Sequence, residues 1–286
     1  VIHAVNPYVL GSGGVFYARL LGLPLVASYH TNVATYALYY RLGFLHHPAR
    51  WWTRQMHNRA GLNLCTSEAT RAYLLSEGIK HVRLWSQGVD TRLFHPGKAS
   101  LEWRNELSGG HPEAPLLLFV GRLAPEKGIE RLKAVLRALP GARLALVGEG
   151  PARVGLEREF AGTPTVFTGL LRGEDLAAAY ASADAFLFPS TTDTLGLSML
   201  EALASGLPVV AAGSGAAHEV VESGQSGLLY DPRSEGALVA AVRRLFGEQG
   251  LRQRLSRGAR TAAEQRDWAS ATRVLRGYYE EVRKGR

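Results

Sequence analysis

The strongest constraint on the fold is a regular alternation of short apolar runs and amphipathic stretches from about residue 115 onward. The apolar runs predict strands at Leu116–Val120, Arg143–Val147, Thr165–Thr168, Ala185–Phe188 and Pro208–Ala212. Apolar residues at helical spacing predict helices at Ile129–Leu139, Glu174–Ala183 and Glu235–Glu248. Such alternation is typical of a parallel sheet covered by helices. We therefore predict a doubly wound α/β domain, which binds ligands at the carboxyl ends of its strands.

The first hundred residues repeat this pattern less completely. Strands are predicted at Val1–Val5, Leu25–Ser28, Gly61–Cys65 and Val82–Trp85, and Gly11–Gly14 is predicted to form a turn. Because the chain opens directly on an apolar strand, we expect a Rossmann-like domain that is incomplete at its N-terminus. The Gly- and Pro-rich stretch Thr91–Pro115 suits a connection between domains. The expected domains are therefore 1–95, 110–266, and a C-terminal helix over 267–286 that packs back on the first domain.

Composition narrows the class of protein. With 286 residues, 46% of them hydrophobic, the chain can bury a sizeable core. It has no apolar run of the roughly 18 residues that a membrane span needs and no signal peptide, so we expect a cytoplasmic protein. Cys65 is the only cysteine, which excludes an internal disulfide and a cysteine-cluster metal site. The net charge of +8 favours acidic partners, but without nucleic-acid motifs we expect no nucleic-acid partner.

A basic motif follows the predicted strand that ends at Val120. In Phe119–Gly128 the strand runs into Gly121 and delivers Arg122 and Lys127 to the loop before a helix. Two cations at the carboxyl end of a strand can bind a diphosphate, since each charge-assisted hydrogen bond contributes roughly 1.5 to 3 kcal/mol. The alternative is a solvated basic loop.

The most specific signal is the segment Phe188–Gly206, in which a strand, a polar loop and a helix follow one another. Gly196 has no side chain to keep a phosphate from the first amides of that helix. Asp193 precedes those amides and Glu201 follows eight positions later, so the two carboxylates could accept hydrogen bonds from a sugar and from a ribose diol. The alternative is that Asp193 caps the helix and Glu201 is exposed on it.

This segment resembles the signature of retaining GT-B glycosyltransferases of family 4, in which an acid, seven residues and a glutamate bind the donor. Asp193 and Glu201 match that spacing, although the family usually has glutamate first. Arg122 and Lys127 match the family's diphosphate-binding pair. The resemblance implies two Rossmann-like domains facing across a cleft, with the donor bound by the second domain.

The chain is similar in more detail to sulfoquinovosyl-diacylglycerol synthases and to mannosyltransferases that act on glycolipids. The similar strings are Ala27–Thr31, Leu84–Asp90, Val166–Gly169, Ala179–Ser182 and Asp267–Trp268. This resemblance implies that His30, Arg122, Lys127 and Asp193 take part in catalysis. The implied donor-binding residues are Gly121, Gly148, Phe167, Thr168, Leu170, Thr194, Leu195, Gly196, Leu197 and Glu201.

An aromatic and basic segment lies in the first domain. It comprises Tyr36, Tyr39, Tyr40, Arg41, Phe44, Trp51, Trp52, Arg54 and Arg59. Amphipathic aromatic side chains beside cations suit docking on an anionic membrane surface, where a lipid acceptor lies. The alternative is an ordinary helix packed within the domain.

Together these features predict a retaining hexosyltransferase that moves a sugar from a nucleotide diphosphate to a lipid or glycan acceptor. UDP-sulfoquinovose, another UDP-hexose and GDP-mannose remain open as donors, and we expect neither a metal nor another cofactor. The alternatives are a sugar-nucleotide epimerase or phosphorylase of the same fold, and a donor-binding fragment without catalysis.

Overall fold

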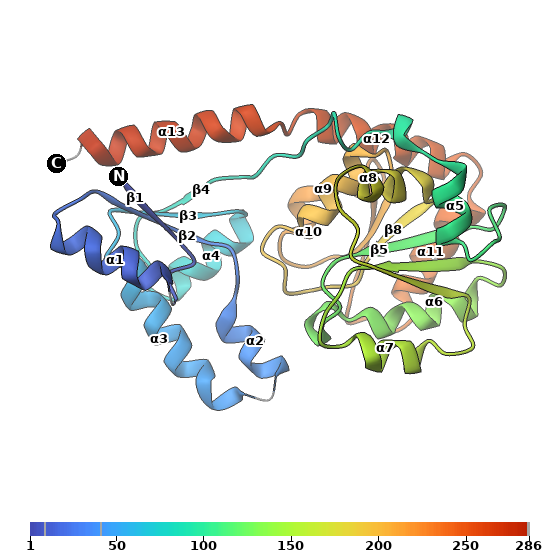
Figure 1. The fold of residues 1–286 in the computed structure, drawn as a ribbon, viewed down its shortest axis with the longest axis horizontal. Coiled ribbons are helices and arrows are strands. Elements are labelled where there is room, and N and C mark those ends of the chain that lie inside the picture. Colours follow the sequence, from blue (N-terminus) through green and yellow to red (C-terminus); the bar gives the residue numbers. More distant parts are fainter. Residues whose placement is uncertain (9, 41, 285–286) are drawn as a thin grey trace. The chain divides into compact units, whose positions relative to one another are not determined.

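The computed structural model describes residues 1–8, 10–40 and 42–284, which form two compact α/β units. Unit 1 contains Val1–Gly88, Thr192–Leu195 and the C-terminal stretch from Trp268, and unit 2 contains Val89–Thr191 and Gly196–Asp267. Each unit has its own parallel sheet and its own hydrophobic core (Figure 1).

Unit 1 is built on a four-stranded parallel sheet in the order β1-β2-β3-β4. The strands are β1 (Ile2–Val5), β2 (Leu25–Tyr29), β3 (Leu62–Cys65) and β4 (Val82–Leu84). The helices are α1 (Leu10–Leu20), α2 (Val33–Tyr39), α3 (His46–His57), α4 (Glu68–Ser76) and α13 (Trp268–Lys284). Every residue of β2 and β3 is buried, as expected for strands covered on both faces.

Two layers of helices cover this sheet. On one face, side chains of α1 and α3, including Val15, Ala18 and Met56, pack against β1 and β2. On the other face, α13 contributes Leu275, Tyr278 and Val282 to a cluster around Val26 and Leu64 (Figure 1). The Tyr278 hydroxyl donates a hydrogen bond of 2.9 Å to the Leu84 carbonyl, and the Trp85 indole donates one of 3.1 Å to the Ala271 carbonyl. The C-terminal helix is therefore part of unit 1.

Unit 2 is built on a six-stranded parallel sheet in the order β10-β9-β8-β5-β6-β7. The strands are β5 (Leu116–Val120), β6 (Arg143–Val147), β7 (Thr165–Gly169), β8 (Ala185–Phe188), β9 (Val209–Ala212) and β10 (Gly227–Tyr230). The helices are α5 (Leu101–Leu107), α6 (Leu132–Ala138), α7 (Arg153–Glu159), α8 (Gly173–Ser182), α9 (Leu197–Ala204), α10 (Ala217–Val220), α11 (Ala237–Gly247) and α12 (Leu251–Glu264).

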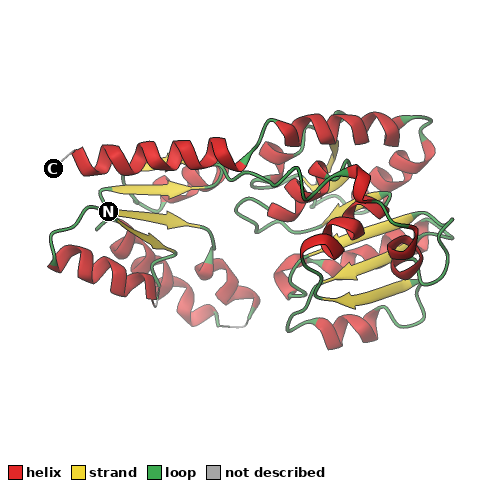
Figure 2. Cartoon of the chain, turned by 45° about the horizontal axis from the view of Figure 1, so that its top comes forward, coloured by secondary structure: helices red, strands yellow, loops and turns green. Residues whose placement is uncertain are grey.

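Helices cover both faces of the unit 2 sheet, with α6 and α7 on one side and α8 and α9 on the other (Figures 1 and 2). Neighbouring strand residues such as Leu117 and Leu118 point to opposite faces, yet both are fully inaccessible to solvent. The predicted doubly wound α/β architecture is thus confirmed. The predicted bounds of β5, β6 and β8 match the structure residue for residue.

The predicted turn at Gly11–Gly14 is wrong, because these residues lie inside α1. Its first turn is held by Ser12, whose hydroxyl donates a 3.0 Å hydrogen bond to the Pro7 carbonyl. Gly11 has a steric role there, since a Cβ at this position would lie 3.0 Å from the Asn6 carbonyl oxygen. The strand β10 was not predicted from the sequence.

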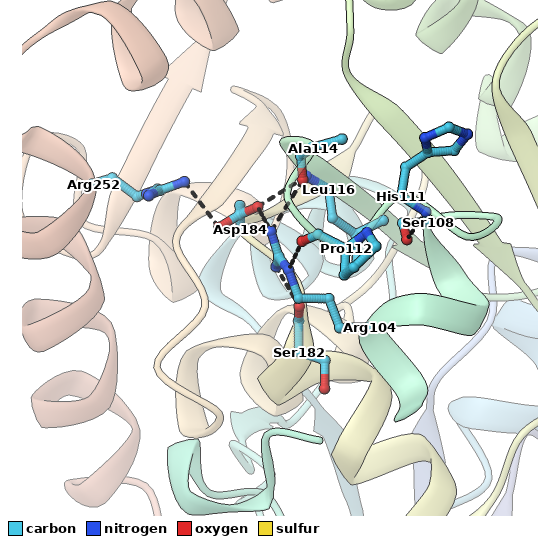
Figure 3. A network of polar contacts seen from close by, with 9 residues as sticks. All are labelled: Arg104, Ser108, His111, Pro112, Ala114, Leu116, Ser182, Asp184 and Arg252. Carbon is cyan, nitrogen blue, oxygen red and sulfur yellow. Dashed lines mark hydrogen bonds and ion pairs between the residues drawn. The ribbon is translucent and has the colours of Figure 1, made fainter. Parts of the chain in front are cut away.

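The stretch 91–115, expected to be a connection, is folded into unit 2 and contains α5. Arg104 of α5 and Asp184 form an ion pair of 2.9 Å between Nη2 and Oδ2, and Arg252 of α12 binds the other carboxylate oxygen at 2.8 Å (Figure 3). The Asp184 carboxylate also accepts a 2.9 Å hydrogen bond from the Leu116 amide. Arg104 donates further hydrogen bonds to the Ser182 and Ala114 carbonyls. These contacts fix the stretch to the start of β5 and of β8.

Candidate functional site

The switch point of the unit 2 sheet lies between β5 and β8. From β5 the chain builds the sheet outward through β6 and β7, and then returns to β8 on the other side of β5 before continuing to β9 and β10. In doubly wound sheets ligands bind at such a switch point, where the loops after adjacent strands leave in opposite directions. Ser190 Oγ, after β8, lies 3.5 Å from the Glu126 carbonyl oxygen, after β5.

Glycines close the carboxyl ends of β5, β6 and β7. The Gly121 amide donates to the Val147 carbonyl at 3.0 Å, and the Gly148 amide donates to the Gly169 carbonyl at 2.8 Å. Gly148 has a φ of +135°, and a Cβ there would lie 2.0 Å from the Gly121 carbonyl oxygen. Only glycine fits at position 148, because the backbone at the end of β6 approaches that at the end of β5 so closely.

The predicted cations Arg122 and Lys127 both lie in the loop after β5. Arg122 is exposed, and within the part of the chain that the structure describes no carboxylate pairs with it. Lys127 is half-buried at the end of a 3-10 turn, Pro125–Lys127, which Gly128 closes with a φ of +64°. The loop after β5 thus holds one exposed cation, Arg122, and one half-buried cation, Lys127, whose backbone is fixed in the 3-10 turn.

The helix after β8 begins without a side-chain cap. Gly196 precedes α9 with a φ of +75°, and a Cβ there would lie 2.6 Å from Met199 Cε. Gly196 itself has no side chain that could accept a hydrogen bond from the first amides of α9, and the first turn of this helix carries no acid. The dipole of α9 favours an anion at this end of the helix.

Glu201 lies on α9, one turn further along the helix than its uncapped start. It is half-buried rather than exposed, and its Oε2 accepts a hydrogen bond of 2.9 Å from the hydroxyl of the fully buried Tyr180. Burial raises the pKa of Glu201, and the hydrogen bond from Tyr180 partly opposes this shift. A desolvated and oriented carboxylate is well suited to accept hydrogen bonds from ligand hydroxyls.

The remaining predicted donor-binding residues of unit 2 lie at the ends of strands or of α9. Phe167 and Thr168 are half-buried near the end of β7, and Leu170 just beyond it is 57% exposed. Leu197 is the exposed first residue of α9. All of them lie on the carboxyl side of the parallel strands, as expected for this fold.

His30 lies directly after β2 in unit 1 and is half-buried. Its Nε2 is 2.9 Å from the Ser28 hydroxyl, and its ring makes an edge contact with Trp85. Its backbone amide donates to Asn6 Oδ1 at 2.8 Å. Burial lowers the pKa of His30, so its imidazole is neutral at pH 7. The ring is therefore suited to hydrogen bonding with an uncharged group such as a sugar hydroxyl.

The segment Thr192–Leu195 belongs to unit 1 and joins His30. The Thr194 hydroxyl donates a 2.7 Å hydrogen bond to the His30 carbonyl, while the Thr194 carbonyl accepts a 3.0 Å hydrogen bond from Thr66 Oγ1. Asp193 in this segment is half-buried, and Leu195 is buried. The structure thus brings His30 and Thr194 together in unit 1, and assigns Arg122, Lys127, Gly196 and Glu201 to unit 2.

Two roles were not predicted from the sequence. Tyr180 orients Glu201, and Thr66 holds Thr194, yet neither residue was among the predicted site residues. The only sequence signal for Tyr180 was its place in the string Ala179–Ser182, which carried a resemblance without a role. A tyrosine in a helix rich in alanine could have been recognised as a buried hydroxyl that needs a partner.

Comparison with known proteins identifies the two units. Residues 104–262 match the family model of glycosyl transferases group 1, and residues 1–93 match that of Glycosyltransferase Family 4. Sulfoquinovosyl transferase SQD2 of Arabidopsis thaliana is 41% identical over 96% of this chain and 55% of the relative. A GDP-mannose-dependent alpha-mannosyltransferase of Mycolicibacterium smegmatis is 41% identical over 99% of this chain and 73% of the relative.

More distant relatives extend the comparison. The alpha-monoglucosyldiacylglycerol synthase of Streptococcus pneumoniae is 29% identical over 85% of this chain and 58% of the relative. The structure of a sucrose-phosphate synthase from Thermosynechococcus elongatus superposes with a TM-score of 0.86, at 25% identity, over 99% of this chain and 74% of the other. The chain thus spans between about half and three quarters of the length of these proteins.

Two parallel α/β units, with cations and an uncapped helix start at the switch point of the second, define a glycosyltransferase of the GT-B fold. The matching family models and the similar relatives identify the family within that class. The chain belongs to glycosyltransferase family 4, also described as glycosyl transferases group 1.

Proposed function

We propose that this protein transfers a hexose-type sugar, with retention of anomeric configuration, from a nucleotide diphosphate donor to a lipid or glycan acceptor. The proposal is supported by the positions of Arg122 and Lys127 in the loop after β5 and of the start of α9 after β8, since β5 and β8 flank the switch point of unit 2. Cations and helix amides together stabilise the charge that develops on a departing diphosphate, an electrostatic effect that usually contributes most to such catalysis.

Each predicted residue has a chemical task in this proposal. Arg122, Lys127 and the α9 amides bind the diphosphate, and Glu201 accepts hydrogen bonds from the ribose diol. His30 and Asp193 contact the transferred sugar. An acceptor hydroxyl oxygen forms the new bond to the anomeric carbon while the bond from that carbon to the diphosphate oxygen breaks. The leaving diphosphate takes up the hydroxyl proton, so the reaction needs neither an enzyme nucleophile nor a further cofactor.

The donor is a UDP-sugar or GDP-mannose, and the residues do not choose between them. The two most similar relatives named above differ in exactly this respect, one being a sulfoquinovosyl transferase and the other GDP-mannose-dependent. The base would meet mostly backbone at the glycine-lined ends of β6 and β7. We expect no metal in the site, because the two cations and the helix amides neutralise the diphosphate.

The acceptor side of the proposal rests on charge and on exposed aromatic residues. The first 67 residues contain no aspartate or glutamate, whereas they contain five arginines. Phe44, Trp51 and Trp52 are exposed, and Arg54 and Arg59 are exposed cations of the same region. Arg41, predicted to belong to this surface, lies outside the described residues. A cationic, aromatic surface suits peripheral docking on an anionic membrane, at its cytoplasmic face.

No helix in the described ranges is both long enough and apolar enough to cross a membrane. Docking would therefore depend on surface contacts. Co-sedimentation with vesicles tests this: we expect binding to vesicles that contain phosphatidylglycerol and little binding to phosphatidylcholine vesicles. Equal recovery with both would contradict docking on anionic lipid.

A thermal-shift screen against UDP, GDP and their sugars tests the donor site. A ligand at a hundred times its dissociation constant stabilises the folded state by about 2.7 kcal/mol, which raises the melting temperature by several degrees. Stabilisation by one nucleotide family identifies the base, and no stabilisation by any of them contradicts the proposal. Binding without transfer would instead indicate a donor-binding module, and release of free sugar without acceptor would indicate an epimerase.

A further inference from the structure

An apolar pocket lies in unit 1 between α2, α3 and the segment that joins them. Its volume is about 520 Å³, and its lining includes Tyr36, Tyr40, Leu45, Trp51 and Trp52. Among the described residues that line it none is charged, and their side-chain polar atoms are two tyrosine hydroxyls and two indole nitrogens. A sugar, a nucleotide or a peptide would leave polar groups without partners there, so the pocket selects a hydrocarbon ligand.

The walls of this pocket are held in place by polar contacts outside it. His46 Nδ1 lies 2.9 Å from the Ala34 carbonyl oxygen, which ties the start of α3 to α2. The Arg50 guanidinium binds both carboxylate oxygens of Glu77 at 2.7 Å, which ties α3 to the end of α4. The Thr53 hydroxyl, one turn further along α3, lies 3.1 Å from the Tyr8 hydroxyl. These contacts fix the walls, so the pocket is preformed in unit 1, as small-molecule sites usually are.

Size and surroundings indicate which hydrocarbon fits. If a methylene group occupies roughly the 30 Å³ that a water molecule occupies in the liquid, 520 Å³ holds on the order of 15 methylene groups. That is the size of one acyl chain. Trp51 and Trp52 are 55% and 39% exposed at its edge, and tryptophan is enriched where a protein meets the membrane interface. The charge around the pocket also suits an anionic membrane surface, because α2 and α3 carry no acidic residue.

We propose that this pocket binds one hydrocarbon chain of the lipid acceptor. The inference rests on the proposed function and makes it more specific, because a glycan acceptor without a lipid would leave the pocket unused. By binding one chain, the pocket would also let unit 1 remove the acceptor lipid from the membrane in part. The name of the diacylglycerol-glycosylating relative supports the same class of acceptor.

Brominated alkyl maltosides, used below their micelle concentration, test the proposal. They are uncharged, so their binding is independent of docking on anionic lipid, and their bromine quenches Trp51 and Trp52 on contact. We expect saturable quenching, with an affinity that rises roughly fourfold for each added methylene from octyl to dodecyl chains.

Two variants and one control locate the binding. Ala49→Phe fills the pocket and should abolish saturable quenching, whereas Leu38→Phe, on α2 but outside the lining, should retain it. Leu45→Gln makes the lining polar at a position that is 41% exposed, and it should weaken binding about tenfold even if Ala49→Phe fails to fold.

Quenching that does not depend on chain length, or that is equal in Ala49→Phe and the wild-type protein, would overturn the proposal. The same preparations are also tested for stabilisation by nucleotides. If a nucleotide stabilises the protein while the maltosides do not bind, the chain pocket fails and the donor site stands. If no nucleotide stabilises it, the proposed function fails, whatever the maltosides do.

Discussion

The hydroxyl of Tyr180 on α8 donates a 2.9 Å hydrogen bond to Glu201 Oε2 on α9, and so fixes the direction of a carboxylate in the proposed donor site. The Tyr180 ring is fully buried and makes edge and tilted contacts with Phe94 and Phe186. These ring contacts leave the hydroxyl little freedom. Tyr180 therefore positions the Glu201 carboxylate, which binds the donor in the proposed function.

Tyr180→Phe removes this hydroxyl and keeps the ring. We expect the affinity for UDP or GDP to fall about fivefold to tenfold, because Glu201 loses its orientation, and the free energy of unfolding to fall by about 1 kcal/mol. Isothermal titration calorimetry measures the affinity. Tyr230→Phe is the matched control, since it removes a buried hydroxyl from β10 that does not contact Glu201. An equal loss of affinity in both variants would show that Tyr180 has no specific role.

The Glu201→Gln variant should have opposite effects on the free energy of unfolding at pH 8 and on nucleotide affinity. Burial raises the pKa of Glu201 above its usual 4.5, so the folded state binds the proton more tightly than the unfolded state does. This group therefore stabilises the fold at low pH, and the stabilisation is lost as pH rises through the raised pKa. A glutamine is neutral and can still accept from Tyr180. We expect the variant to gain in urea stability relative to wild type at pH 8 but not near pH 4.5, and to bind nucleotide more than tenfold more weakly. The same stability difference at both pH values would contradict the desolvation account.

A buried histidine makes unit 1 sensitive to acid. His57 is 1% exposed, its Nδ1 lies 2.8 Å from Asn63 Oδ1, and burial lowers its pKa from 6.5 to about 4. As pH falls below 6.5 the unfolded state binds the proton first, so stability that is present at neutral pH is lost on the way down to pH 4. With 1.36 kcal/mol for each unit of pKa, the loss at pH 4 is about 3 kcal/mol.

Urea unfolding followed by tryptophan fluorescence measures this loss, since Trp51, Trp52, Trp85 and Trp268 all belong to unit 1. His57→Gln keeps a donor for Asn63 and removes the titration. The stability of this variant should fall about 3 kcal/mol less than that of the wild type between pH 7 and pH 4. Parallel losses in both proteins would exclude His57 as the cause.

Asp184→Asn should destabilise unit 2, because it breaks two ion pairs of a carboxylate that is only 15% exposed. We expect a loss of about 2 kcal/mol, seen as a lower melting temperature in differential scanning calorimetry. Glu159→Gln breaks an ion pair with Lys133 at a carboxylate that is 50% exposed, and it should lower the melting temperature far less, because solvent screens exposed ion pairs. Similar effects of the two changes would mean that the Asp184 network is not structural.

The sequence predicted the sheet of unit 2 well because its strands are buried on both faces and therefore appear as apolar runs between polar loops. It failed at Gly11–Gly14, where glycines favour a turn by local propensity but tertiary contacts of Ala18 and Val15 hold a helix. It failed also at 91–115, since two of the partners that hold Arg104, Ser182 and Asp184, lie 78 and 80 residues away along the chain. Glycine and proline signal irregular backbone, but they do not show whether that backbone is packed.

The candidate site was predictable only in part, for a similar reason. Residues next to strand ends, such as Arg122, Lys127 and Gly196, could be placed by the topology of a parallel sheet. The contact of Tyr180 with Glu201 and that of Thr194 with His30 join residues 21 and 164 positions apart. No spacing rule predicts such pairs, because they depend on how separate helices and loops pack.

The central claim is that the switch point of unit 2 binds the donor diphosphate through Arg122 and Lys127. It is tested most directly by initial-rate kinetics of sugar transfer, with the donor found in the thermal-shift screen, for the wild-type protein and for an Arg122→Ala, Lys127→Ala double variant. Loss of two charge-assisted hydrogen bonds, at roughly 1.5 to 3 kcal/mol each, predicts a turnover at least a hundredfold lower with the fold intact. A double variant that turns over at a near-normal rate would contradict the assignment of the site.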